Sequence, residues 1–419
     1  MFMWSRVAPL NIVVLIGVDG PSLVPVLPQV LATLQRRHPL LRARVTGGAG
    51  RPAFEALHGG AIDPIPLRVL AVDEAPGVPG VIAEEMNTGF DASSGPLIRV
   101  TYVRGTGSQD EMVLTLHHCI SDAVGTGSLV SEILEGCAAQ LSGEDWAPGS
   151  LDLPPAMPSL LPRRHRGLSG VRRALAFVGG ELADELRYRR GTMGMRRGVP
   201  SSGRAASRTV RLSTEETTEL VSWSRRRRLT LTSVLNAALL LEAGARLYDD
   251  RPCAMRAVVW VDLRPHLSPP PAPETLGGYH SMVRFVVRVD RRNGFEFLAR
   301  TVQDLASQRV DRGDRFAAAV LSPGVARAVM RTSSQRMGTT ALSYGGAQHI
   351  RRRYGPIDVR EVQGFISNSP RGAEVAATAG VSRGSLWCNL LYVDSELDAA
   401  TVGAIESGLA ARLVEASRS

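Results

Sequence analysis

The chain has 419 residues and a net charge of +9, and all 49 of its basic residues are arginine. This length suits two domains that each build a sizeable apolar core. The absence of lysine excludes a lysine nucleophile, a Schiff-base lysine and a lysine phosphate clamp. The apolar run 11–18 is too short to span a bilayer and lacks the basic flank of a signal peptide. We therefore expect a cytoplasmic protein without stable membrane insertion.

The four cysteines lie far apart within apolar runs, without the paired spacing of a metal site. This pattern predicts reduced core residues rather than disulfides. Cys119 follows His118 directly and invites a cysteine–histidine nucleophile. Neighbouring side chains on an extended chain point to opposite sides, however, which disfavours that pairing.

The first part of the chain alternates between strand-like and helix-like segments. Residues 11–18 are typical of a strand, and 23–37 have helical apolar spacing. The segment 38–45 leads from this helix into another strand, and 46–80 is rich in glycine and proline, as hairpins are. The turn sequence 87–97 then leads into a further strand. These alternations predict a mixed βαβ domain.

The stretch 112–134 carries the main candidate for a catalytic site. Residues 112–117 alternate as a strand does, and a helical stripe begins after Asp122, a residue type that caps helix N-termini. His117, His118 and Asp122 therefore lie where a strand ends and a helix begins. The pattern alone also fits purely structural roles. The two adjacent imidazoles diverge on a strand and cannot bind one metal ion without distortion, so we predict no metal site.

The chain is expected to divide into a first domain at 1–145, a basic linker and crossover at 146–207, and a second domain at 208–419. The linker begins with prolines and continues as an arginine-rich segment, in which the apolar spacing of 175–182 predicts a helix. The second domain again mixes strands and helices, including a nearly all-apolar helix at 232–247. We expect loops at 268–275 and 310–340. The linker arginines are Arg163, Arg164, Arg166, Arg172, Arg173, Arg187, Arg189, Arg190, Arg196 and Arg197.

Four segments resemble motifs of the condensation-domain and chloramphenicol-acetyltransferase-like acyltransferase superfamily, and they occur in the order that this superfamily has. The stretch 117–123 (HHCISDA) resembles its HHxxxDG motif, and 37–42 (RHPLLR) resembles RHxxLR. Residues 90–99 resemble FDxxxGPLxR, and 276–281 is a weak echo of IGxFVN. Four ordered matches are far more specific than the histidine motif alone.

A fifth feature narrows the resemblance. Residues 260–264 (WVDLR), a proline tract and Leu276-Gly277 are similar to the mycobacterial polyketide-associated acyltransferases of the phthiocerol dimycocerosyl transferase type. The resemblance implies an α/β fold of two chloramphenicol-acetyltransferase-like subdomains arranged in a V. It also implies a tunnel between them, whose shape the loops at 268–275 and 310–340 would influence.

The resemblance also assigns roles within the catalytic motif. His118 would be the general base, a role that suits an imidazole because its pKa lies near neutral pH. Asp122 would hold the loop and pair with an arginine, which matches Arg42, with Arg264 as the second choice. His117 would be structural.

Three further residues concern the stabilisation of the oxyanion and the last residue of the histidine motif. The negative charge of the tetrahedral intermediate needs a hydrogen-bond donor, and Ser281 and Ser343 are the candidates. The glycine of the family motif is replaced by Ala123. If that position required a positive φ or close approach of a pantetheine arm, the methyl group would alter the turn or narrow the site.

These roles imply an O-acyltransferase acting on a hydroxyl of a polyketide, lipid or glycosylated natural product. Its donor would be a phosphopantetheine thioester on an acyl carrier protein or coenzyme A, with no covalently bound cofactor. The arginines within 163–197, 225–228 and 351–353 would steer either anionic donor. The alternatives are a stand-alone condensation enzyme that forms an amide and a non-catalytic carrier-binding homologue. A nucleic-acid binder is disfavoured because the basic residues are scattered and no recognition module is evident.

Overall fold

In the computed structural model of the chain, the described residues fall into two compact units. The first unit comprises Met1–Ala156, Pro271–Tyr279 and Ala347–Ser367, and the second comprises Met157–Pro270, His280–Gly346 and Asn368–Ser419. The structure describes residues 5, 8–47, 52–59, 62–73, 76–188, 202–331, 336–347 and 350–418. No helix within these ranges is both long enough and apolar enough to cross a membrane.

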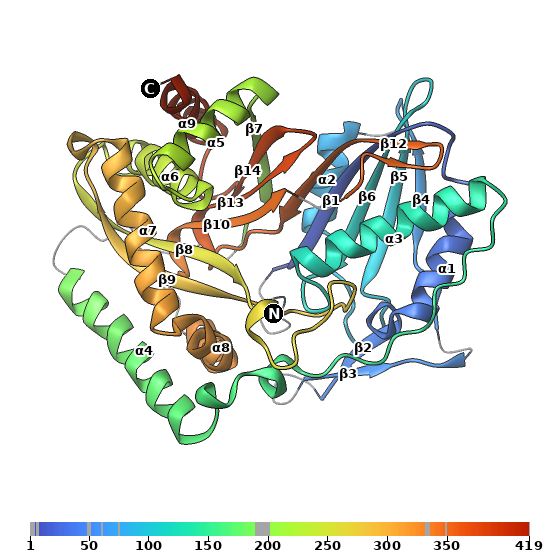
Figure 1. Cartoon of the computed structure of the whole chain (residues 1–419), viewed down its shortest axis with the longest axis horizontal. Coiled ribbons are helices and arrows are strands. Elements are labelled where there is room, and N and C mark those ends of the chain that lie inside the picture. Colours follow the sequence, from blue (N-terminus) through green and yellow to red (C-terminus); the bar gives the residue numbers. More distant parts are fainter. Residues whose placement is uncertain are drawn as a thin grey trace. The chain divides into compact units, whose positions relative to one another are not determined.

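The first unit is built on a six-stranded sheet in the order β11-β12-β1-β6-β5-β4 (Figure 1). The central strands β1 and β6 pair antiparallel along their whole length, with Asn11 opposite His117. The parallel pair β4–β5 closes one edge. The strands are β1 (Asn11–Asp19), β4 (Leu67–Ala71), β5 (Ile98–Arg104), β6 (Gln109–His117), β11 (Arg353–Tyr354) and β12 (Ile357–Ile366).

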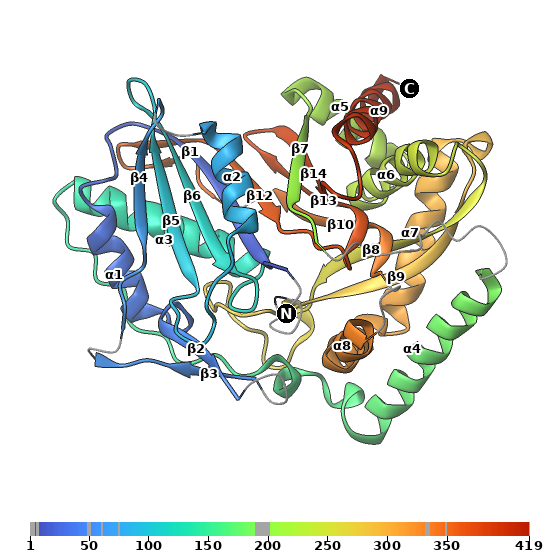
Figure 2. The ribbon, with the colours of Figure 1, turned by 180° about the vertical axis from the view of Figure 1, so that it is seen from behind.

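Helices cover both faces of this sheet. The views from the two sides show α1 (Leu27–Arg37) and α3 (Ala123–Leu141) on one face and α2 (Gly77–Asn87) on the other (Figures 1 and 2). A separate ribbon of β2 (Ala43–Thr46) and β3 (Ala53–Ala56) follows α1. The sheet is therefore buried on both sides, which explains why β1 is apolar along almost its whole length.

The predicted alternation of residues 112–117 is confirmed. Met112, Leu114 and Leu116 on β6 pack in the core beneath α1 and α3, while the residues between them face the other side. The strand ends at His117 and α3 begins at Ala123, so the histidine motif occupies the connection between them. Because successive side chains on a strand point to opposite faces of the sheet, this alternation fixes the face toward which each strand residue of the motif points.

The second unit has its own six-stranded sheet in the order β7-β14-β13-β10-β8-β9. The pair β10–β8 is parallel, and the pairs β8–β9, β13–β14 and β14–β7 are antiparallel. The strands are β7 (Ala205–Arg211), β8 (Cys253–Asp262), β9 (His280–Val289), β10 (Gly338–Ala347), β13 (Ala373–Ser382) and β14 (Ser385–Val393). The helices are α4 (Gly167–Tyr188), α5 (Thr214–Arg226), α6 (Leu231–Leu247), α7 (Phe295–Asp311), α8 (Asp314–Arg331) and α9 (Ala399–Arg418).

The apolar helix expected at 232–247 is confirmed as α6, which lies in the core of the second unit. The expected loop at 310–340 is wrong, because it contains the 18-residue helix α8. The glycine- and proline-rich segment 46–80 forms the expected β2–β3 hairpin, but it also supplies β4 and the start of α2.

The division into units differs from the boundaries that we expected. The first unit extends past residue 145 and takes in two late segments, Pro271–Tyr279 and Ala347–Ser367. The second of these supplies β12, which pairs with β1 over most of its length. The expected linker supplies α4, a 22-residue helix of the second unit. The arrangement of the subdomains in a V and the tunnel stay predictions.

Candidate functional site

The connection between β6 and α3 holds the histidine motif in a short hydrogen-bonded turn. The backbone N–H of His117 donates to the Leu97 carbonyl, and that of His118 donates to the Leu10 carbonyl. The backbone N–H of Ile120 donates back to the His117 carbonyl, which closes the turn. These bonds fix the backbone of both histidines against neighbouring strands, so their rings start from defined positions.

The ring of His118 is held in one tautomer. Its Nδ1 lies 3.1 Å from the Ser121 carbonyl oxygen. A carbonyl only accepts hydrogen bonds, so Nδ1 carries the proton and, in the neutral ring, the lone pair is on Nε2. The residue is buried, and this burial lowers the pKa of His118 below its ordinary value, because an imidazolium loses its hydration there. The ring is therefore neutral near pH 7 and can accept a proton at Nε2.

His117 has the opposite tautomer. Its Nδ1 accepts a hydrogen bond from the backbone N–H of Cys119 at 3.1 Å, so the neutral ring carries its proton on Nε2. Burial and the adjacent His118 lower the pKa of His117 to about 4. The ring lines a cavity of about 260 Å³ within the first unit. The lining residues are Ser5, Ala8, Pro9, Leu10, Asn11, Gly89, Phe90 and His117.

Burial makes Cys119 a poor nucleophile at this turn. Cys119 is buried, and burial raises the pKa of its thiol to about 12, so the reactive thiolate is disfavoured. All four cysteines are free and buried, as the sequence predicted. Within the described ranges, no cluster of histidine, cysteine, aspartate or glutamate side chains has the arrangement of a metal site.

Asp122 joins three parts of the first unit. One carboxylate oxygen accepts from the backbone N–H of Gly125 and caps α3, as the sequence predicted. The other accepts from the backbone N–H of Tyr279, at 2.9 Å. Tyr279 belongs to the late segment Pro271–Tyr279, so this contact ties the catalytic turn to a stretch of chain 157 residues away.

Tyr279 is the main site residue that the sequence analysis missed. Its ring is 2% exposed, and its hydroxyl donates to the Pro155 carbonyl. Gly277 has φ +147°, and a Cβ there would lie 2.6 Å from the Tyr279 ring. The Leu276-Gly277 pair of the family motifs is the signal in the sequence that points to this residue, because glycine is needed where this ring packs against the backbone.

The predicted pair between Arg42 and Asp122 is wrong in this structure. The Arg42 guanidinium donates to the Leu57 carbonyl at 2.7 Å and lies 3.4 Å from His58 Nδ1. Between Arg42 and Asp122, both of them described residues, the structure records no ion pair. Arg42 instead ties the start of β2 to the residues that follow β3.

The preceding residues of the RHPLLR motif support α3 directly. Arg37 Nε and His38 Nε2 lie 3.0 and 2.7 Å from the Glu132 carboxylate of α3. Burial raises the pKa of Glu132, but the His38 hydrogen bond and the Arg37 charge outweigh it and leave the pKa below its ordinary value. The motif thus anchors the helix that begins at the catalytic turn.

The FDxxxGPLxR-like segment places an aromatic ring beside His117. The rings of Phe90 and His117 meet edge-on, with 6.2 Å between centroids, and the Arg99 guanidinium lies over the Phe90 ring, 4.3 Å from its centroid. Arg99 is itself paired with Glu85 at 2.5 Å. Gly95 has φ +72°, and a Cβ there would lie 2.7 Å from the Ala43 carbonyl oxygen, so this turn requires glycine.

The remaining predicted site residues lie in the second unit. The Ser281 hydroxyl donates to the Arg315 carbonyl at 2.6 Å, so its proton is engaged within that unit. Ser343 is half-buried on β10. Arg264 is buried and begins a 3₁₀ turn, where its backbone N–H donates to Asp262. The pairing of Arg264 with Asp122 and the oxyanion roles of both serines stay predictions.

Ala123 occupies an ordinary helical position. It is the first residue of α3, directly after the Asp122 cap, and its side chain is exposed. A positive φ is therefore not required there, and the replacement of the family glycine does not strain the turn.

The basic segments differ in how far their charge is available. Arg351 and Arg353 pair with Glu135 and Asp358, which leaves Arg352 as the exposed member of that group that has no carboxylate partner among the described residues. Of the linker arginines, Arg163, Arg164, Arg166, Arg172, Arg173 and Arg187 are exposed. Arg189, Arg190, Arg196 and Arg197 lie outside the described residues.

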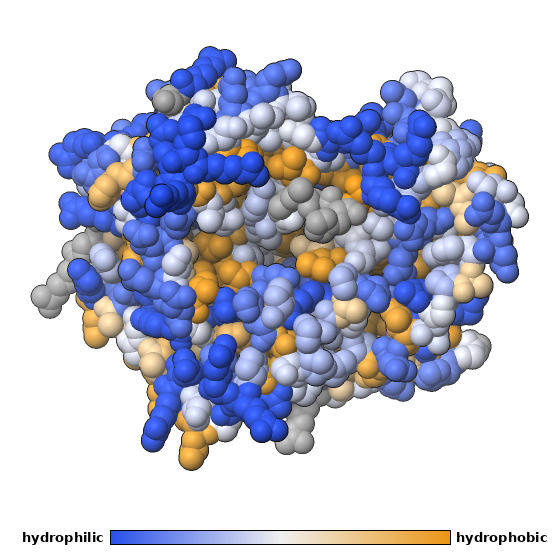
Figure 3. All heavy atoms as spheres, viewed as in Figure 1, coloured by the Kyte–Doolittle hydropathy of each residue, from blue (hydrophilic) through white to orange (hydrophobic). Residues whose placement is uncertain are grey.

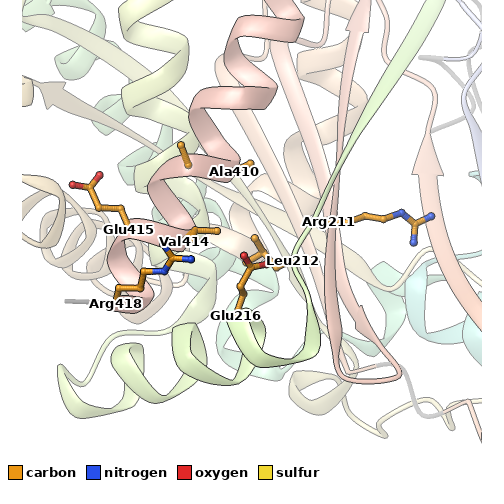
Figure 4. A pocket seen from close by; sticks show the side chains of 8 residues that line it. Arg211, Leu212, Glu216, Ala410, Val414, Glu415 and Arg418 are labelled. Atoms are coloured by element: carbon orange, nitrogen blue, oxygen red, sulfur yellow. The ribbon is translucent and has the colours of Figure 1, made fainter.

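A second cavity, of about 610 Å³, has no part in the histidine motif. It lies in the second unit against α5 and α9, and Figure 4 shows Glu216, Val414, Glu415 and Arg418 gathered there while the Arg211 side chain turns away. The residues that line this cavity include no histidine, serine or cysteine.

Two protein-family models match this chain. Residues 11–152 match the family model described as "Condensation domain", and 201–380 match "Phthiocerol/phthiodiolone dimycocerosyl transferase C-terminus". The predicted resemblance is confirmed. The two matches lie in separate parts of the chain, and both families are transferases of the acyl and condensation type.

Two curated relatives are much larger synthetases, and the chain matches only a part of each. The chain is 28% identical over 196 residues to "Phosphinothricin tripeptide synthetase PhsB" of Streptomyces viridochromogenes, covering 45% of this chain and 16% of that protein. It is 31% identical over 143 residues to "Nonribosomal peptide synthetase kk1B" of Curvularia clavata, covering 33% of this chain and 1% of that protein. The chain therefore spans a small fraction of these relatives.

Solved structures confirm the fold. Polyketide synthase associated protein 5 from Mycobacterium tuberculosis has a TM-score of 0.71 at 16% identity, covering 99% of this chain and 96% of that one. The first condensation domain of the calcium-dependent antibiotic synthetase has a TM-score of 0.76 at 16% identity, covering 99% and 95%. The trichothecene 15-O-acetyltransferase of Fusarium sporotrichioides has 0.76 at 13% identity, covering 98% and 92%. The predicted α/β fold of this superfamily is thus correct.

Proposed function

We propose that this chain transfers an acyl group from a phosphopantetheine thioester to a hydroxyl group, with His118 as the general base. The observation that carries the proposal is the contact between His118 Nδ1 and the Ser121 carbonyl. It places the lone pair on Nε2, and burial keeps the ring neutral at the working pH. The family comparisons support acyl transfer as the reaction class.

The proposed reaction needs only the ring of His118 to move protons. Nε2 accepts the proton of the acceptor hydroxyl as its oxygen attacks the thioester carbonyl carbon. The tetrahedral intermediate then collapses, the carbon–sulfur bond breaks, and the leaving thiolate takes the proton from the imidazolium. Asp122 does not touch the reacting atoms in this scheme. It holds the turn through the backbone N–H groups of Gly125 and Tyr279.

The donor is an acyl group on a carrier protein or on coenzyme A, and the acceptor is a small-molecule alcohol. Amide formation is the second candidate, and the match of residues 11–152 to condensation domains supports it, together with the likeness to a tripeptide synthetase. The same base serves both reactions because the attacking hydroxyl and amine each lose a proton. The acceptor panel must therefore contain both.

The test is an acyl-transfer assay with coenzyme A and carrier-protein thioesters against a panel of alcohols and amines. His118→Asn keeps a side-chain N–H that can donate to Ser121 but has no Nε2, so we expect the rate to fall by a factor of roughly 10² to 10⁴. His117→Asn is the matched control, because its side-chain oxygen can replace Nδ1 as acceptor for Cys119. Equal rates in the wild type and His118→Asn would overturn the role of His118. A wild type that is inert with every donor would favour the binding homologue.

A further inference from the structure

Helix α4 carries an apolar stripe that faces away from its own unit. Large aliphatic side chains recur along it at intervals of three or four residues, which places them on one side of the helix. The stripe runs for about 27 Å, given the rise of about 1.5 Å per residue. It consists of Leu168, Val171, Leu175, Val178, Leu182 and Leu186, which are 84%, 56%, 66%, 40%, 58% and 70% exposed.

The opposite side of α4 holds the helix to its unit, and most of its contacts are polar. Glu181 pairs with Arg284 of β9, and Asp184 pairs with Arg309 of α7 at 2.6 Å. Arg173 donates to the Arg312 carbonyl. Phe177, which packs against α8, is the apolar contact of this side. The helix therefore has the opposite polarity from an ordinary amphipathic surface helix: its ionic side faces the protein and its aliphatic side faces solvent.

Among the side chains that the structure describes, the exposed charge beside the stripe is positive. Arg172 lies four residues after Leu168 and three before Leu175, which places it next to the stripe. Arg187 lies in the last turn of the helix, and the 3₁₀ turn before the helix adds Arg163 and Arg164. None of these four exposed guanidinium groups has a carboxylate partner among the described residues. The acidic side chains Glu181 and Asp184 are turned inward and neutralised.

We infer that α4 binds an anionic lipid surface, lying along the membrane rather than crossing it. An aliphatic stripe bordered by arginine suits the boundary between acyl chains and phosphate headgroups. The arginine stems can extend along the lipid while their guanidinium groups reach the phosphates. A second copy of this helix is a poorer partner, because it would bring arginines against arginines. The described helices contain no membrane-crossing segment, which agrees with a surface position.

The test uses the full chain and sedimentation with vesicles of equal parts phosphatidylcholine and phosphatidylglycerol, compared with vesicles of phosphatidylcholine alone. We expect binding to the anionic vesicles, weaker at about 0.5 M salt than at about 0.1 M because salt screens the arginines. Leu168→Gln/Leu175→Gln/Leu182→Gln should weaken binding by about tenfold or more through the loss of aliphatic surface. Arg172→Gln/Arg187→Gln should abolish the preference for anionic vesicles.

The matched control is Leu153→Gln/Phe297→Gln, which changes two large apolar side chains that are exposed elsewhere, at 47% and 59%. It should bind vesicles as the wild type does. Thermal unfolding shows whether each variant keeps its fold. Absence of binding to anionic vesicles at low salt would overturn the inference. It would also be overturned by a concentration-dependent dimer that the triple leucine variant abolishes while vesicle binding stays unchanged.

Discussion

In the turn between β6 and α3 polar side chains are buried, whereas along α4 aliphatic side chains are exposed. His118, Ser121 and Asp122 are each less than 9% exposed, and Leu168 on α4 is 84% exposed. In the turn, backbone groups satisfy the buried polar atoms, so the cost of dehydrating them is offset. On α4, no described part of the unit covers the stripe. Buried polar side chains in an enclosed turn are typical of reactive sites, whereas exposed aliphatic side chains along a helix are typical of surfaces that bind a partner.

The largest expected effect separates the two histidines of the turn. His118→Asn should lower the rate of acyl transfer by a factor of roughly 10² to 10⁴, because the proton acceptor is lost. His117→Asn should stay within about tenfold of the wild type, because it touches no reacting atom in the proposed scheme. Steady-state kinetics on both variants measures this difference. A greater loss in His117→Asn would show that the catalytic roles are reversed.

The next effect tests whether Asp122 supports the turn through backbone groups. Asp122→Ala leaves the N–H groups of Gly125 and Tyr279 without their acceptor, and each loss costs about 1 to 3 kcal/mol of unfolding free energy. We expect a total of about 3 kcal/mol from denaturant titration. Asp122→Asn keeps one side-chain oxygen and should lose less than half as much. A change below about 0.5 kcal/mol in Asp122→Ala would contradict this role.

Acid should destabilise the buried turn. Burial holds the pKa of His117 at about 4 in the folded protein, below the 6.5 of an exposed histidine. Between these two pH values the unfolded chain binds the proton and the folded chain does not, so stability falls as pH decreases from about 6.5 to about 4. The full difference corresponds to about 3 kcal/mol.

Unfolding measured across this pH range checks the prediction. His117→Asn should flatten part of the decline, and His58→Asn, at an exposed position, should leave it unchanged. An identical pH dependence in the wild type and His117→Asn would refute the assignment. For catalysis, the lowered pKa of His118 implies that kcat/KM stays level as pH falls through 6.5 and declines only at lower pH.

The smallest effect concerns the stability of α4. Leu175→Gln/Leu182→Gln should change the free energy of unfolding by no more than about 0.5 kcal/mol, because both side chains are exposed in the folded protein. Phe177→Leu, on the opposite side of the helix, should cost about 1 kcal/mol. Thermal unfolding distinguishes them. A large loss in the double leucine variant would show that the stripe is covered by the protein itself.

The local parts of the site were predictable because they depend on neighbouring residues. Strand alternation and an N-capping aspartate placed the end of β6 and the start of α3 within the motif, and the structure confirms both. The ordered family motifs predicted the fold, and the comparisons confirm it. The tautomers of His117 and His118 were not predictable, because they depend on which backbone group each ring meets after the turn has closed.

The predictions that were wrong concern residues whose contacts come from segments far away in the sequence. Arg42 was expected to bind Asp122, yet it bonds the Leu57 carbonyl after the β2–β3 ribbon folds back. Nothing local distinguishes β12 as a strand of the first sheet, since its partner β1 lies more than 300 residues earlier. The helix α8 replaced an expected loop because its burial arises from contacts with α4 and β9.

The sequence by itself determined the alternation of strands and helices, the position of the histidine motif at a strand–helix junction, and the family resemblance. These features follow from side-chain periodicity and capping over a few neighbouring residues. Only the tertiary structure decided which ring nitrogen of each histidine carries the proton, that Tyr279 binds Asp122, and that the aliphatic side of α4 faces outward. Those features depend on contacts between distant segments, whose hydrogen bonds and packing form only when the chain has folded.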